Sequence, residues 1–211
     1  MISKYLAAVA AIALSSSAQA ASFVNGSFEL GTNPGQFSTF TAGQTDITGW
    51  TIGSGSVDYI GSYWAASNGL RSIDLAGNAA GLLSQTFDTV IGRTYRVNFD
   101  LWANDDGGTF PRLAFVNVGA GDLTFSSNGG GTKAAPNWVT QTFSFVASAT
   151  STTLSFRADS ISANTFFGPA LDNVSVSAIP EPATWALMLG GFGLVGGAMR
   201  SRRRANATVS A

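Results

Sequence analysis

The sequence predicts an all-β fold, a jelly-roll β-sandwich, flanked by an N-terminal signal peptide and a C-terminal transmembrane helix. Three observations on the central region, residues 21–178, indicate this class. Several short segments alternate apolar and polar residues with a period of two, as strands with one buried face do. Clusters of glycine, asparagine and serine separate them, and 25 of the 211 residues are glycine. No segment of this region carries a clear apolar stripe of helical period.

The clearest predicted strand covers residues 95–102. Its odd positions are apolar or aromatic, whereas Arg96, Asn98, Asp100 and Trp102 occupy the even positions. Other β-like runs of similar length occur at residues 83–87, 139–146, 152–158 and 171–176. Many short strands joined by turns favour a sandwich or barrel. We assign Trp50 and Trp138 to its core.

Composition excludes several classes of function. There is no cysteine and no histidine, so disulfides, thiolate metal sites and a Ser-His-Asp triad are ruled out. The net charge is −1, but the region from residue 21 to residue 179 carries six basic and eleven acidic residues. Such an acidic body argues against nucleic acid as a partner, because phosphates require a basic surface.

The first twenty residues have the three ordered parts of a secretory signal peptide. Lys4 supplies the positive charge, residues 5–14 form an apolar run, and Ala18-Gln19-Ala20 closes the segment. An A-x-A ending of this kind suits signal peptidase. We therefore expect an exported chain whose mature form begins near Ala21.

The C-terminal end combines an apolar segment with an arginine cluster. Residues 183–199 contain no charged residue, and at about 1.5 Å per residue a helix of this length just spans a bilayer core. The arginines that follow would hold that end on the cytoplasmic side. The residues that carry the pattern are Pro180, Glu181 and Pro182 before the apolar segment, and Arg200, Arg202, Arg203 and Arg204 after it.

This order of features resembles the PEP-CTERM sorting signal, at residues 179–204, with residues 205–211 as a short tail. The resemblance implies handling by an exosortase, a membrane enzyme that recognises the Pro-Glu-Pro region. Such proteins occur in bacteria that make exopolysaccharide. It implies a protein of the cell envelope or extracellular matrix, anchored in the inner membrane by its C-terminal helix until it is sorted.

The β region has a second resemblance, to the choice-of-anchor C family. The segments that carry it are Asn25-Gly26-Ser27-Phe28-Glu29, Gly49-Trp50, Val57-Asp58-Tyr59-Ile60-Gly61, Arg71-Ser72-Ile73-Asp74-Leu75, Ser84-Gln85-Thr86-Phe87 and Leu171-Asp172-Asn173-Val174. That family is similar to galactose-binding-like jelly rolls and to carbohydrate-binding modules. The resemblance implies a jelly roll in an extracellular setting more firmly than it implies a ligand.

The related carbohydrate-binding modules commonly hold a structural calcium ion where the first and last strands meet. Carried over to this chain, Glu29 and Asp172 are its carboxylate ligands. Calcium takes oxygen ligands only, which suits a chain without cysteine or histidine. The alternative is that both carboxylates cap strand ends or accept hydrogen bonds from backbone amides. Asp105 and Asp106 are interpreted as part of a solvated turn.

Sugar binding requires an aromatic platform beside polar groups. The polar face of the 95–102 strand offers both, in Arg96, Asn98, Asp100 and Trp102. Further candidates in the region are Asp74, which alternates with apolar neighbours, and the loop aromatics Tyr63 and Trp64. The alternative is an ordinary solvated face, or an arginine–aspartate pair buried under a loop.

These observations leave three functions open. The first is a non-catalytic envelope or matrix protein that associates with exopolysaccharide through its jelly roll. The second is a glycan-cleaving enzyme with a carboxylate pair about 5–9 Å apart, drawn from Asp58, Asp74, Asp100 and Glu29. The third is a purely structural biofilm or adhesion protein. The body contains a single glutamate, and domains of this size more often bind glycans than cleave them.

Overall fold

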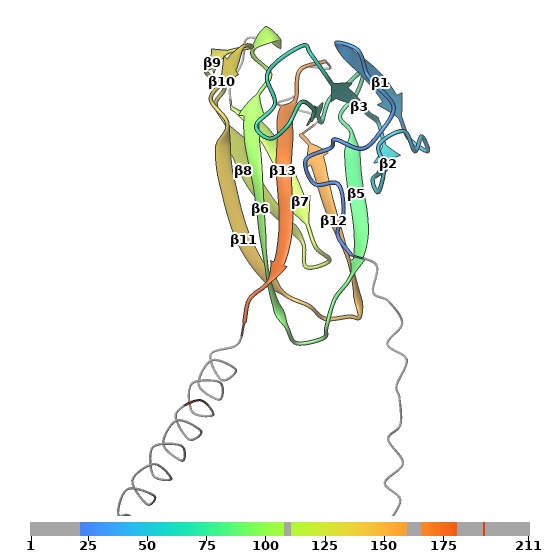
Figure 1. Ribbon diagram of the computed structural model, residues 1–211, viewed down its shortest axis with the longest axis vertical. Helices are drawn as coiled ribbons and strands as arrows, with labels where there is room; N and C mark the ends of the chain where they lie inside the picture. The colour runs from blue at the N-terminus through green and yellow to red at the C-terminus, as the bar shows by residue number, and fades with distance from the viewer. Residues whose placement is uncertain (1–21, 108–110, 160–165, 181–191, 193–211) are drawn as a thin grey trace, which may run out of the picture.

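The computed structural model describes residues 22–107, 111–159, 166–180 and Phe192. These residues form a sandwich of two antiparallel sheets (Figure 1). In chain order the elements are β1 (Phe37–Thr41), β2 (Thr51–Ser54), β3 (Ser56–Ile60), β4 (Ser72–Asp74), β5 (Leu82–Asp88), β6 (Thr94–Ala103), the 3₁₀ helix η1 (Asp105–Gly107), β7 (Arg112–Asn117), β8 (Asp122–Ser127), β9 (Gly131–Thr132), β10 (Ala135–Pro136), β11 (Val139–Val146), β12 (Ser151–Ala158) and β13 (Pro169–Ala178).

One sheet has the strand order β1-β3-β4-β13-β6-β11, and the facing sheet has the order β2-β5-β12-β7-β8. Strands β9 and β10 form a separate small hairpin. The chain crosses repeatedly between the two large sheets, for example from β5 to β6 and from β12 to β13. Both sheets are antiparallel throughout the described residues. The predicted all-β jelly-roll sandwich is therefore confirmed.

The main core fills the space between the two sheets. It is built from alternate residues of each strand, as the period-two pattern predicts. From β6, for example, Val97, Phe99 and Leu101 point into it, and Phe99 packs edge-on against Phe156 of β12. Trp50 belongs to this core, as predicted, whereas Trp138 is half-buried against a second cluster.

This second cluster lies on the outer face of the larger sheet. It contains Ile60, Trp64, Trp102 and Ala170, and Tyr63 and Trp138 pack against it. Trp64 comes from the loop of residues 61–71, and Trp138 follows the β9–β10 hairpin. These two segments cover the sheet, so the end of β6 that carries Trp102 is buried on both faces.

Strand β13 contains an irregularity where it faces the middle of β6. Its register shifts between Asp172 and Ser175, and Asn173 there has a φ of 51°. Asparagine tolerates this left-handed conformation better than most residues, as a bulge requires. Just before this irregularity, Asp172 lies directly opposite Asp100 of β6.

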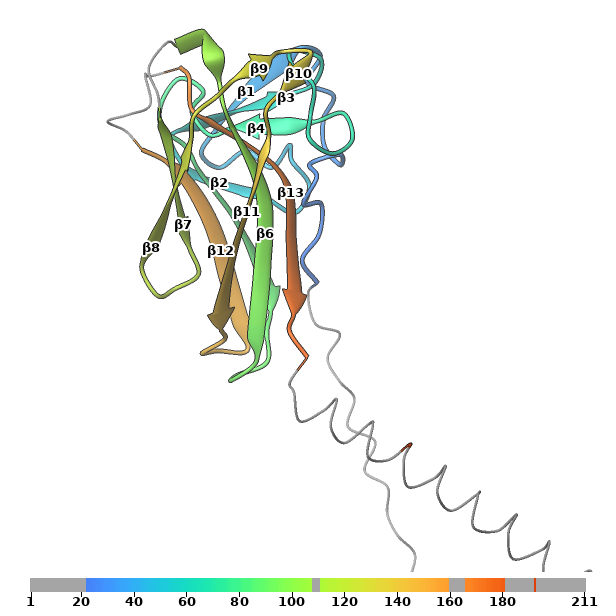
Figure 2. The ribbon, with the colours of Figure 1, turned by 90° about the vertical axis from the view of Figure 1, so that its left-hand side faces the viewer.

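The two ends of the sandwich differ. The end called the upper end here carries β1, β3, η1 and the β9–β10 hairpin (Figures 1 and 2). The described domain begins and ends toward the opposite, lower end, at residues 22 and 180. The chain therefore continues toward its C-terminal segment from the end that lies away from these loops.

Several predicted segments lie outside the described residues. These are the signal peptide at residues 1–20, the apolar segment 183–199 apart from Phe192, and Glu181, Pro182 and the four arginines. Pro180 is described and exposed. Within the described ranges, no helix is long and apolar enough to cross a membrane.

Candidate functional site

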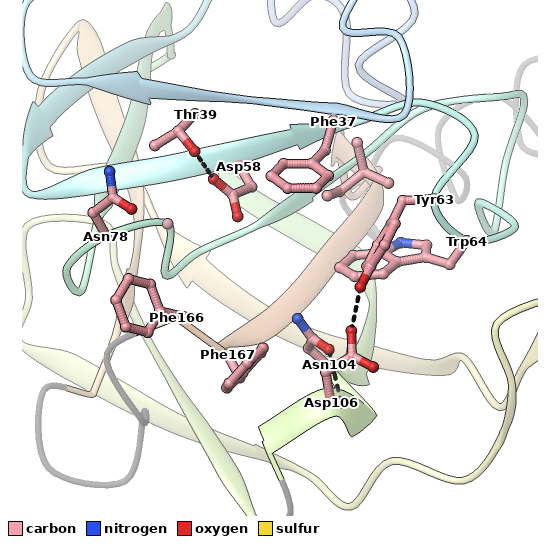
Figure 3. A pocket seen from close by; sticks show the side chains of 12 residues that line it. Phe37, Thr39, Asp58, Tyr63, Trp64, Asn78, Asn104, Asp106, Phe166 and Phe167 are labelled. Atoms are coloured by element: carbon pink, nitrogen blue, oxygen red, sulfur yellow. Dashed lines mark hydrogen bonds between the residues drawn. The ribbon is translucent and has the colours of Figure 1, made fainter.

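A pocket of about 200 Å³ opens at the upper end of the sandwich. Figure 3 shows its side chains, which come from β1, β3, the loop after β3, η1 and the segment before β13. The lining residues are Phe37, Thr39, Asp58, Ile60, Tyr63, Trp64, Gly77, Asn78, Asn104, Asp106, Phe166 and Phe167.

Asp58 is the acidic group that faces the centre of this pocket. It lies opposite Thr39 in the β1–β3 pair, and the Thr39 hydroxyl donates to its Oδ1 at 2.5 Å. Its second oxygen points to the open space between the lining side chains (Figure 3). Partial burial raises the pKa of Asp58, and the hydrogen bond from Thr39 opposes this. Because a Cβ at Gly77 would lie 2.9 Å from Asp58 Oδ1, only glycine fits there without a shift.

Asp74 lies behind the pocket, directly opposite Asp58 in the β3–β4 pair. It is fully buried and accepts hydrogen bonds from the backbone amides of Ala76 and Gly168 and from the Asn104 side chain, at 2.8–2.9 Å. Burial raises its pKa to about 7, although these bonds oppose the shift. With both oxygens engaged, Asp74 holds Asn104 and the segment before β13 in place.

Aromatic side chains form the rim of the pocket. Phe37 and Phe166 are 45% and 52% exposed, which is unusual for large apolar side chains. Phe37 packs edge-on against Tyr63 at 5.3 Å between ring centroids. Tyr63 in turn contacts Trp64, which is buried in the second cluster. The rim therefore offers aromatic faces to solvent on a rigid base.

Tyr63 is fixed by ionic partners. Its hydroxyl donates to Asp106 Oδ2 at 2.7 Å, and the Lys133 ammonium lies 2.8 Å from the same oxygen and 3.8 Å from the Tyr63 ring centroid. Burial would raise the pKa of Asp106, but the bonds from Lys133 and Tyr63 outweigh it and lower this pKa. Asp106, expected in a solvated turn, is thus a partner of the aromatic rim.

Two shallower grooves adjoin the pocket. One, of about 540 Å³, shares Tyr63 and Trp64 with it and extends past Lys133 to Leu70. The next, of about 380 Å³, shares Leu70 with the first groove and reaches Arg71. The pocket is therefore one end of a longer surface that follows the loop of residues 61–71.

The loop of residues 61–71 is held by buried or half-buried carboxylates. Glu29 Oε1 accepts from the amides of Leu70 and Arg71 at 2.8 and 2.9 Å. Asp172 Oδ2 accepts from the Asn68 amide at 2.8 Å, and Asp100 Oδ2 from the Ser67 hydroxyl at 2.5 Å. Each bond lies at the outer face of the larger sheet and keeps the loop closed over it.

Glu29 and Asp172 accept hydrogen bonds from backbone amides, which is the alternative to a calcium site that the sequence left open. Asp172 is fully buried, and its Oδ1 also accepts from the Asn173 amide. Within the described ranges no three acidic side chains come close enough to hold a metal ion. The two carboxylates do not complete a calcium site by themselves, and the expected calcium ion stays a prediction.

The predicted sugar-binding residues separate into two groups. Tyr63 and Trp64 line the pocket, and Asp74 supports it from behind. Arg96 and Asn98 lie in the first half of β6, and Asn98 bonds to Thr142 and Ser175 within the sheet. Asp100 is buried, and it accepts bonds from Ser67, Thr140 and Asn173.

The expectation that Trp102 offers an open stacking platform is wrong. Trp102 is 1% exposed, packs edge-on against Trp64 at 5.3 Å and donates its indole N–H to the Gly130 carbonyl at 2.8 Å. The residue does lie on the polar face of β6, as predicted. The loop of residues 61–71 covers that face, and the sequence pattern of β6 alone does not reveal the cover.

Sequence reasoning missed most of the pocket. Phe37, Thr39, Asn78, Asn104, Phe166 and Phe167 were not singled out. The signal that was available is the aromatic pair Phe166-Phe167, which stands before Gly168-Pro169 in a turn-like stretch.

Comparison with known proteins shows the family to which this protein belongs. Residues 178–204 match the PEP-CTERM protein-sorting motif, which confirms the predicted sorting signal and marks an exported, envelope-associated β-sandwich protein. Residues 21–177 match the family described as Protein of unknown function (DUF642). Because that match covers most of the chain, the protein belongs to the DUF642 family.

One curated relative is halomucin of Haloquadratum walsbyi (strain DSM 16790 / HBSQ001), which is 31% identical over 163 residues. The aligned region covers 75% of this chain but 2% of halomucin, so the chain spans a small fraction of that relative's length. 

Among solved structures, TmCBM61 in complex with β-1,4-galactotriose is 15% identical, with a TM-score of 0.42, over 75% of this chain and 99% of that one. The CBM35 of Paenibacillus barcinonensis is 16% identical, with a TM-score of 0.44, over 67% and 99%.

Proposed function

We propose that this protein is a non-catalytic polysaccharide-binding protein of the cell envelope or extracellular matrix, sorted there by an exosortase after signal peptidase has removed its leader. The observation that supports glycan binding most directly is the pocket at the upper end. It combines exposed aromatic side chains, Phe37 and Phe166, with a carboxylate oxygen of Asp58 that faces the open space.

These groups suit a sugar ring. A pyranose has an apolar face that packs against an aromatic side chain, and hydroxyl groups that donate to a carboxylate or an amide oxygen. Asp58 and the exposed Asn78 supply such acceptors beside Phe37 and Phe166. The pocket is smaller than the roughly 300–1,000 Å³ typical of sites for drug-sized ligands, so it suits one sugar residue. The adjoining grooves then accommodate the neighbouring residues of a polymer.

The same geometry disfavours the glycan-cleaving alternative. Hydrolysis needs two carboxyl groups that both reach the substrate. Of the four candidates, Asp74 and Asp100 are buried and hydrogen-bonded, and Glu29 accepts from the 61–71 loop. The other acid of the pocket, Asp106, is bonded to Lys133 and Tyr63. Among the described lining residues, Asp106 has its charge paired with Lys133, whereas Asp58 has no salt bridge to a basic side chain.

The placement of the pocket suits a protein held at a membrane. The pocket opens at the upper end, whereas the chain leaves for its sorting signal from the lower end (Figure 2). The pocket therefore lies at the end of the domain opposite residue 180, after which the sorting signal continues. After sorting, the same end remains available to exopolysaccharide.

Affinity electrophoresis of the full chain tests this function, with gels that contain neutral, amino or acidic polysaccharides, including the producing bacterium's own exopolysaccharide. Loss of an aromatic anchor commonly costs about 2 kcal/mol or more, so Phe166→Ala should weaken binding about thirtyfold or more. Ile91→Ala, which removes an exposed apolar side chain of another loop, is the matched control and should bind normally.

Three results would overturn the proposal. Binding of none of the polysaccharides removes glycan recognition, and concentration-dependent self-association in its place would favour the structural alternative. Equal binding by Phe166→Ala and the unsubstituted chain would move the site elsewhere. Release of reducing sugar from a bound polysaccharide would show an enzyme.

A further inference from the structure

We infer that the pocket selects an amino sugar whose nitrogen is free and protonated, over neutral, N-acetylated and acidic sugars. This inference rests on the proposed function, because it names the class of sugar that the same pocket takes. Three properties of the pocket carry it: the charge of its floor, the absence of a compensating cation in its described lining, and its aromatic walls.

The floor of the pocket is negative. Asp58 faces the pocket and Asp74 lies directly opposite it in the neighbouring strand. The charge that the floor presents is that of Asp58, because burial raises the pKa of Asp74 to about 7 and the buried Arg112 guanidinium interacts electrostatically with Asp74. A cation bound in the pocket would pair with the Asp58 oxygen that Thr39 leaves free, so this oxygen favours a positively charged ligand.

No basic side chain lines the described part of the pocket, since Arg112 is fully buried and interacts with Asp74 and Asp105 rather than with the open space. None of the twelve described lining residues is lysine or arginine. Lys133 stands nearby, but its ammonium is bonded to Asp106 and lies over the Tyr63 ring. The hydroxyl of Thr39 satisfies one oxygen of Asp58 and leaves the other toward the pocket. A uronic acid would therefore place its carboxylate against Asp58 with no cation to balance it.

The walls favour an ammonium group over a metal ion. Phe37, Tyr63, Phe166 and Phe167 present aromatic rings around the space that Asp58 faces (Figure 3). Aromatic faces attract organic cations through their quadrupole. A calcium ion instead requires six to eight oxygen ligands, and no described group of three acidic side chains offers them. A protonated amine on a sugar ring uses both the carboxylate and the rings.

The difference between sugars follows from one substituent. A free amine at C2 gives a charge-assisted hydrogen bond to Asp58, which is roughly twice as strong as a neutral one. Acetylation removes that charge and adds bulk, and a hydroxyl at the same carbon gives a neutral hydrogen bond. Comparing the affinities of sugars that share ring and linkage but differ at C2 therefore distinguishes a preference for the free amine from glycan binding in general.

Isothermal titration calorimetry of the full chain against two matched series tests the inference. The gluco series is the tetramer of β-1,4-glucosamine, its fully N-acetylated form and cellotetraose; the galacto series is galactosamine, N-acetylgalactosamine and galactose. We expect the free-amine member of at least one series to bind ten times more tightly or better than its matched sugars. Asp58→Asn keeps an acceptor for Thr39 and should bring all members of that series within about twofold.

Asp46→Asn is the matched control, because it removes one carboxylate outside the pocket and should leave the preference intact.

A second measurement needs no variant: raising the salt concentration should weaken binding of the free-amine sugar more than that of its neutral partner. The inference would be overturned, and the proposed function kept, by either of two results. The first is that the free-amine sugars bind no more tightly than their matched sugars. The second is that the chain binds a polysaccharide but neither series. A chain that binds no polysaccharide at all would overturn the proposed function itself.

Discussion

The two halves of strand β6 show how one alternating pattern produces two different surfaces. In the lower half, Tyr95 and Val97 are buried and Arg96 is exposed, as for a sheet that faces solvent on one side. In the upper half, Asp100 and Trp102 are buried as well. The strand itself does not change; the difference is the cover over its upper half, which the loop of residues 61–71 and the segment of Gly130 and Trp138 provide.

That cover changes the chemistry of the upper end. Polar groups under a loop must find partners within the protein, because an unsatisfied buried polar group costs about 1–3 kcal/mol. Asp74, Asp100 and Asp172 all do so, through backbone amides and short polar side chains. The lower half of β6 has no such requirement, since Arg96 is exposed and Asn98 is only half-buried. The two halves should therefore respond very differently to substitution and to pH.

The largest expected effect is that of Trp102→Ala. The indole is buried between Trp64, Trp138 and the sheet, and its N–H bonds to Gly130. Removing a buried tryptophan typically lowers the free energy of unfolding by about 3–5 kcal/mol. Chemical denaturation of the full chain measures it. A loss below about 1 kcal/mol would show that the loop of residues 61–71 does not cover Trp102 in solution.

The second prediction concerns pH. Burial raises the pKa of both Asp74 and Asp172 to about 7, from an ordinary value of 3.8. The folded protein thus binds these protons more tightly than the unfolded chain does. Their contribution to stability is complete below about pH 4 and is lost as pH rises toward 7, by up to about 1.4 kcal/mol per pH unit for each group.

The melting temperature should therefore fall between about pH 4.5 and pH 7.5. Asp172→Asn, which mimics the protonated form, should make this decline less steep. Asp46→Asn, whose carboxylate is not buried under the loop, should leave the slope unchanged. A melting temperature that is constant or rises across this range would show that both groups are ionised in the folded protein.

The fold was predictable because its evidence is local. Each strand's alternation, such as that of residues 95–101, is contained in a few consecutive residues and needs no knowledge of the rest of the chain. The run predicted at residues 139–146 coincides with β11. The core position of Trp50 follows from the same reasoning, since a large aromatic beside a strand is most stable between the sheets.

The pocket was mostly unpredictable because its evidence is not local. Thr39 and Asp58 are 19 residues apart, and Tyr63 and Asp106 are 43 residues apart. Phe166 is more distant still along the chain. The error at Trp102 has the same origin, because nothing within β6 tells which half a loop will cover. Tyr63 and Trp64 were found as aromatics in a loop, and Asp74 from its alternation with apolar neighbours, whereas Asp58 was named only as a possible catalytic carboxylate.

The third prediction sharpens the role of the carboxylates beneath the loop. Glu29 Oε1 accepts from two successive amides, so Glu29→Gln, which keeps the shape but removes the charge, should lower the free energy of unfolding by about 1 kcal/mol. Denaturation without a chelator measures this loss, and the same measurement with a chelator tests whether calcium is bound. A calcium ion at 100 times its dissociation constant would add about 2.7 kcal/mol.

If the predicted calcium ion is bound at Glu29 and Asp172, the chelator lowers the melting temperature, added calcium restores it, and Glu29→Gln abolishes the response. An unchanged melting temperature in chelator would overturn the calcium prediction and leave the backbone amides as the partners of both carboxylates.

The smallest expected effect is that of Arg96→Ala, and it decides whether the lower half of β6 takes part in binding. Arg96 is exposed, toward the end of the sandwich that lies away from the pocket. Substitution of such a residue usually changes stability by no more than about 0.5 kcal/mol. Polysaccharide affinity should not change either, since the site that we propose is walled by Phe37 and Phe166. Affinity electrophoresis of Arg96→Ala and Phe166→Ala in the same gel compares their polysaccharide affinities directly. If Arg96→Ala weakens binding as much as Phe166→Ala does, the polymer runs down the open sheet, and the lower half of β6 is a binding surface rather than a plain solvated face.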